Sequence, residues 1–103
     1  MRGIGTDVMS DKYILDGRAV KEASLVEWAK WFETADRNVA KSKISDDVNV
    51  STVFLGLDHS FGKGPPLLFE TMIFGGEHDQ YLERFETWEQ AEVGHAAAVA
   101  IAE

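Results

Sequence analysis

Two short clusters of histidine and carboxylate residues are the parts of this sequence best suited to chemistry. Asp58 and His59 are adjacent, just after an apolar run and before a glycine-rich stretch. Glu92 and His95 are three residues apart, which places both side chains on one side of a helix and lets them share a metal ion. Because histidine titrates near neutral pH and binds divalent metals, His59 and His95 can serve as acid, base or ligand.

These four residues are our catalytic candidates, and His59, Glu92 and His95 are our metal-ligand candidates, provided that the two histidines converge in the fold. Each residue also has a simpler interpretation. Asp58 fits a turn that starts at its side-chain oxygen, beside a solvated His59. His95 falls on an apolar helix side and fits a hydrogen-bonded core residue. His78, in an acidic loop, is expected to be exposed.

Other catalytic signatures are absent from the sequence. With no cysteine in the chain, thiolate nucleophiles, disulfides and cysteine zinc sites are excluded. There is no Gly-x-Ser-x-Gly motif. The segment GKGPP at 62–66 looks like a phosphate-binding loop, but it lacks the Gly-Lys-Ser/Thr ending and no helix follows it. We expect a stiff connector there, no cofactor, and a protein that is not an enzyme.

The secondary structure follows from turn signals, helix caps and apolar runs. Asp16-Gly17 between short apolar runs predicts a hairpin. Ser24 and Thr87 are predicted helix N-caps, each with Glu or Gln three residues later. The stretch 37–47 fits an edge strand or a loop. The predicted elements are a hairpin at about 12–22, a helix at 25–36, strands at 48–57, 67–74 and 81–85, and a helix ending near 102.

This order of elements indicates an α+β fold rather than a parallel α/β fold. We expect two layers, with an antiparallel sheet built from the N-terminal hairpin plus a three-strand meander, and both helices packed on one face. Residues 1–11 carry glycines without periodicity and are predicted to be a mobile tail. Residues 12–103 then form a single α+β domain, which is long enough to bury a modest core.

The strands on either side of the 58–66 loop predict a binding surface. Symmetric pairing about that loop puts Val53, Phe69 and Ile73 on the helix-covered face. The opposite face would expose a mixed surface of Phe54, Leu68, Glu70, Met72 and Phe74. Such a surface is typical of protein association or self-association, unless the N-terminal segment covers it. A one-residue slip in register would invert the assignment.

Charge and hydropathy limit the classes of partner. Eighteen acidic against ten basic residues give a formal charge of −8, which argues against binding nucleic acid or anionic lipid. An acidic surface keeps a small protein in solution or docks a basic partner. No apolar run reaches the roughly 18–20 residues needed to span a bilayer, and the N-terminus does not look like a signal peptide. We therefore expect a cytoplasmic protein.

The runs VSTVFLGLDHSFGKGPPLLFETMIFGG at 50–76 and RFETWEQAEVGH at 84–95 resemble a type of small protein encoded by tailed phages and bacterial prophages. The resemblance implies a phage or prophage gene expressed in the bacterial cytoplasm, and it implies no activity.

Taken together, these features favour a non-enzymatic accessory protein. It would bind a host or phage protein, or itself, through the open sheet face and the 58–66 loop. One alternative is a small metal-assisted or acid–base enzyme that uses His59, His95, Glu92 and Asp58. The other is a protein that sequesters a small ligand under the proline-rich loop.

Overall fold

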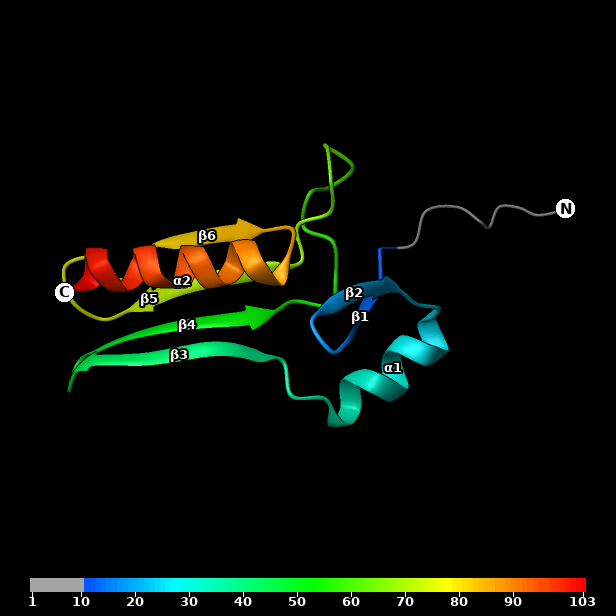
Figure 1. The fold of residues 1–103 in the computed structure, drawn as a ribbon, viewed down its shortest axis with the longest axis horizontal. Coiled ribbons are helices and arrows are strands. Elements are labelled where there is room, and N and C mark those ends of the chain that lie inside the picture. Colours follow the sequence, from blue (N-terminus) through cyan, green and yellow to red (C-terminus); the bar gives the residue numbers. More distant parts are fainter. Residues whose placement is uncertain (1–10) are drawn as a thin grey trace, which may run out of the picture.

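Two antiparallel sheets and two helices make up residues 11–103, the part of the chain that the computed structural model describes (Figure 1). The predicted α+β class is confirmed. Residues 1–10 of the predicted tail lie outside the described residues. The elements are β1 (Tyr13–Asp16), β2 (Ala19–Glu22), α1 (Leu25–Thr34), β3 (Asn38–Ser45), β4 (Val48–Phe54), β5 (Phe69–Phe74), β6 (Leu82–Phe85) and α2 (Trp88–Ala102).

The larger sheet is a meander with the strand order β3-β4-β5-β6. The hairpin β1-β2 forms a separate two-stranded sheet, so it does not extend the meander. The ambiguous stretch 37–47 contains a strand, β3, which lies at one edge of the sheet. Lys41 and Lys43 on this strand suit an edge, because charged side chains discourage pairing with other chains.

Both helices begin at the predicted caps. The Ser24 hydroxyl accepts a hydrogen bond from the Glu27 amide at 3.2 Å, and the Thr87 hydroxyl accepts one from the Gln90 amide at 3.1 Å. Helix α2 lies across one face of the meander, with Ala91, His95 and Ala98 buried against it. Helix α1 packs near the hairpin at the other end of the molecule (Figure 1).

The strand register corrects part of the predicted binding surface. Thr52 pairs with Thr71 and Phe54 with Phe69, which is one residue away from the symmetric pairing. Phe54 therefore faces α2, and both Phe54 and Leu68 are fully buried rather than exposed. Glu70, Met72 and Phe74 do lie on the other face, together with Val53. The α2-facing residues of the two central strands are Val50, Thr52, Phe54, Phe69, Thr71 and Ile73.

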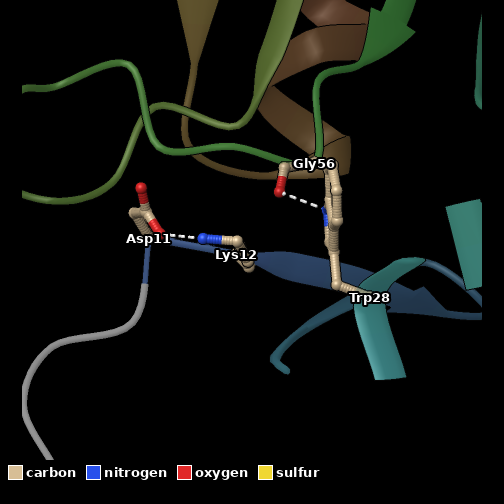
Figure 2. A network of polar contacts seen from close by, with 4 residues as sticks. All are labelled: Asp11, Lys12, Trp28 and Gly56. Atoms are coloured by element: carbon tan, nitrogen blue, oxygen red, sulfur yellow. Dashed lines mark hydrogen bonds and ion pairs between the residues drawn. The ribbon is translucent and has the colours of Figure 1, made fainter. Parts of the chain in front are cut away.

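Helix α1 is attached to the chain just after β4. The Trp28 indole Nε1–H donates a hydrogen bond to the Gly56 carbonyl at 2.9 Å, near the Lys12–Asp11 ion pair of 3.0 Å (Figure 2). Gly56 has a φ of +79°, and a Cβ there would lie 2.7 Å from the ring of Phe32. Only glycine permits both this backbone conformation and this close approach.

Candidate functional site

His95 lies in a buried cluster of hydroxyl groups between α2 and the sheet. Its Nδ1 is 2.8 Å from the Thr52 hydroxyl and its Nε2 is 2.9 Å from the Ser42 hydroxyl. Thr52 is also hydrogen-bonded to Thr71 at 2.5 Å. Three neighbouring strands therefore each contribute one side chain to what we call the hydroxyl–histidine cluster: Ser42, Thr52, Thr71 and His95.

The hydrogen bonds of this cluster fit a structural role, in which they satisfy the polar groups of a buried, neutral histidine. Burial lowers the pKa of His95, so the neutral ring is favoured. The contact between Ser42 and His95 has the length of a nucleophile–base pair, but the other ring nitrogen meets the Thr52 hydroxyl instead of a carboxylate. Among residues 11–103, the hydrogen-bond partners of both ring nitrogens are neutral hydroxyl groups, which stabilise an imidazolium less than a carboxylate would. His95 matches the core interpretation.

Asp58 organises the loop that follows β4. Its carboxylate accepts hydrogen bonds from the Ser60 amide at 2.7 Å, the Ser60 hydroxyl at 3.0 Å and the Leu67 amide at 3.0 Å. Partial burial opposes ionisation of Asp58, but these hydrogen bonds and the nearby His59 together lower its pKa. The side-chain turn predicted at Asp58 is confirmed. His59 uses Nδ1 in a 2.8 Å contact with the Leu57 carbonyl.

Glu92 is directed toward the hairpin. Its carboxylate is 3.9 Å from the Arg18 guanidinium, which also lies 5.4 Å from the centre of the Trp88 ring. Across residues 11–103, no three histidine or carboxylate side chains are close enough together to hold a metal ion. The proposed combination of His59, Glu92 and His95 is therefore not assembled. His78 is exposed, as predicted.

The open sheet face keeps three of the five predicted binding residues. Glu70 forms a 3.0 Å ion pair with Arg84, and this pair satisfies its charge. Met72 is half-buried, while Phe74 is 46% exposed. Phe54 and Leu68 belong to the core and do not contribute to this surface.

The tip of the 58–66 loop is a more prominent apolar feature than the open face. Phe61 is 80% exposed and has a φ of +55°, in the left-handed region that non-glycine residues seldom occupy. It borders a cleft of about 670 Å³ between the loop and the hairpin, which we call the Phe61 cleft. The cleft is lined by Asp11, Tyr13, Glu22, Asp58, Phe61, Gly62, Gly64 and Pro66.

Three of the residues that line the Phe61 cleft, Asp11, Glu22 and Asp58, are acidic. Partial burial and the charges of Glu22, Asp58 and Asp11 raise the pKa of Tyr13, whose phenolate they would repel. Phe61 is not among the candidate residues expected from the sequence. The pattern that could have identified it is an aromatic residue next to a glycine in a loop, where the side chain is seldom part of the core.

The part of the chain that the structure describes contains no helix long and apolar enough to cross a bilayer. No family model, curated protein or solved structure matches the chain.

Proposed function

We propose that this chain is a non-enzymatic protein-binding module that presents the Phe61 cleft to a basic segment of its partner. The observation that carries the proposal is the exposed Phe61 ring, held in a left-handed backbone conformation. Such a conformation costs about 1–3 kcal/mol and persists where the surrounding structure enforces it, commonly at functional sites.

Hydrogen bonds hold the two ends of the 58–66 loop together without a partner. Three hydrogen bonds to Asp58 hold its base, and the His59 amide donates to the Leu67 carbonyl at 3.0 Å across the loop. An aromatic side chain on a preordered loop loses little conformational entropy on binding, and aromatic residues are frequent anchors of interfaces. Phe61 is therefore a suitable anchor.

Charge complementarity points to the chemistry of the partner. Asp11, Glu22 and Asp58 line the cleft, and the chain as a whole carries a formal charge of −8. Lys or Arg side chains are attracted by such a cleft, and a cation can also stack on the Phe61 ring. The resemblance to phage and prophage proteins supports an accessory role for this binding in the bacterial cytoplasm.

Pull-down from bacterial lysate tests the proposal when two matched variants are compared. Phe61→Ala removes the anchor, whereas Leu25→Ala shortens a different exposed apolar side chain, 62% exposed on α1. We expect a protein captured by the wild type to be retained by Leu25→Ala and lost with Phe61→Ala. Equal capture by both variants, or no capture by the wild type, would contradict the proposal.

A second candidate function is the binding of a small cationic ligand in the same cleft. The observation that favours it is the volume of about 670 Å³, which is within the usual range for ligand sites. A thermal-shift screen of small organic cations distinguishes the two functions. Stabilisation that is lost in Glu22→Gln, without any captured protein, would assign the cleft to a small ligand.

A further inference from the structure

A second apolar surface lies between β6 and α2. The groove there has a volume of about 540 Å³ and shares no lining residue with the Phe61 cleft. Its floor is apolar, formed by Phe85, Val93, Gly94 and Ala97, and Glu83 and Glu89 stand at its rim. Val93 is 72% exposed.

The Phe85 ring packs closely against α2 in this groove. The Phe85 ring fits against Gly94 so closely that a Cβ on the glycine would lie 2.0 Å from Cζ of the ring. Beyond Glu92, the exposed side of α2 carries only apolar residues until Glu103: Val93, Ala96, Ala97, Ala100 and Ile101. A helix that is apolar on its outer as well as its inner side is typical of one covered on both sides.

The groove adjoins a free strand edge. Within residues 11–103, β6 has a strand neighbour on one side only, and α2 runs alongside it over the sheet (Figure 1). An extended segment added next to β6 would direct every second side chain toward the flank of α2, where Val93 and Ala97 lie. A fifth strand paired with β6 would therefore place its inward-facing side chains in the groove.

The charges around the groove favour a basic segment of another protein over a second copy of this chain. No Lys or Arg follows Arg84 in the sequence, and Arg84 is paired with Glu70 on the opposite face. A second copy that paired through the same groove would bring its own rim carboxylates against Glu83 and Glu89, an unfavourable arrangement of like charges. A segment with an apolar centre and flanking Lys or Arg residues meets no such repulsion.

We propose that the groove between β6 and α2 binds an extended apolar segment of another protein, flanked by Lys or Arg residues. The segment pairs with the free edge of β6, its apolar side chains cover Val93 and Ala97, and its basic flanks meet Glu83 and Glu89. This binding is independent of the Phe61 cleft.

Selection of peptides from a random display library on the full-length protein tests the proposal. The decisive variant is Ala97→Glu, which places a carboxylate in the groove, and the matched control is Ala96→Glu, an equally simple change at the exposed neighbouring position outside it. We expect enriched peptides with apolar centres and basic flanks. In fluorescence anisotropy their dissociation constants should rise at least about tenfold with Ala97→Glu and hardly change with Ala96→Glu.

Charge dependence provides the second readout. The double variant Glu83→Gln/Glu89→Gln should lower the affinity for these peptides. It should also reduce the salt dependence of their binding, because salt screens the ion pairs at the rim. The proposal would be overturned if no peptides were enriched or if the enriched peptides were acidic. Equal binding of the peptides to Ala97→Glu and Ala96→Glu would also overturn it. A dimer in light scattering that Ala97→Glu dissociates and Ala96→Glu does not would also overturn it, by assigning the groove to a second copy.

Discussion

Replacing Thr52 with valine tests the hydroxyl–histidine cluster most directly. The Thr52 hydroxyl is the shared partner of Thr71 and His95, at 2.5 and 2.8 Å, and both threonines are fully buried. Valine has nearly the same shape, so the change removes the hydroxyl without opening a cavity. It leaves two buried polar groups without this partner, and each such loss costs about 1–3 kcal/mol. We expect the free energy of unfolding to fall by about 2–6 kcal/mol.

Thr71→Val is the matched comparison, because Thr52 then keeps its hydrogen bond to His95. Its expected cost is about 1 kcal/mol, the usual net value of one hydrogen bond. Ser51→Ala, on the open face of the same strand, serves as the control and should stay within about 0.5 kcal/mol of the wild type. Urea unfolding followed by circular dichroism measures all three. A loss of stability in Thr52→Val no larger than that in Thr71→Val would show that Thr52 is not the shared partner of Thr71 and His95.

Three further predictions concern single residues. Because the pKa of His95 is lowered in the fold, the unfolded chain binds its proton first, and stability should fall as the pH drops below about 6.5; His95→Gln should flatten this slope in urea titrations. Asp58→Ala should cost about 1–3 kcal/mol and speed proteolysis within the 58–66 loop; unchanged cleavage would contradict a role in ordering it. Gly56→Ala should destabilise by about 2 kcal/mol or more, whereas Gly64→Ala, at a similar positive φ but in open space, should cost less; equal thermal shifts would show that the contact with Phe32 is unimportant.

Local signals in the sequence were sufficient for most of the elements. Asp16-Gly17, Ser24 and Thr87 predicted the hairpin and both helix starts, because turns and caps depend on a few adjacent residues. Helix α1 ends at Thr34, two residues earlier than expected, and the Asp36 side chain instead accepts a hydrogen bond from the Asn38 amide.

The strand register was predicted less well, because the assumed symmetry of the loop outweighed a pattern within β4. Asn49 and Ser51 alternate with Val48 and Val50, and this alternation already places Phe54 on the apolar side. Pairing through an irregular loop that includes a positive φ at Gly56 cannot be read from the length of the loop alone. The assignment for β5 was correct, because Glu70 marks its open side.

The candidate site was harder to predict, because it depends on contacts between distant segments. Whether His59 and His95 meet is decided by the position of α2 along the sheet, for which no short motif exists. The hydroxyl groups around His95 come from three strands. The register assumed from the sequence turned Thr52 to the open face, so these groups were not expected to lie together. Phe61 could have been noticed as an aromatic residue in a glycine-rich loop, but its exposure and its backbone conformation come from the structure alone.

The attachment of α1 has a consequence for the motions of the chain. None of its residues is fully buried, and its contacts with the rest of the chain are few. They include the Trp28–Gly56 hydrogen bond, the edge contact of Trp31 with the Phe54 ring at 5.7 Å and the stacking of Arg37 on Phe32 at 4.3 Å. Amide hydrogen exchange should therefore be faster in α1 than in α2, as expected for a segment that opens without global unfolding. Since Gly56 leads directly into the 58–66 loop, a partner held by Phe61 should slow that exchange, so that α1 reports binding from outside the contact itself.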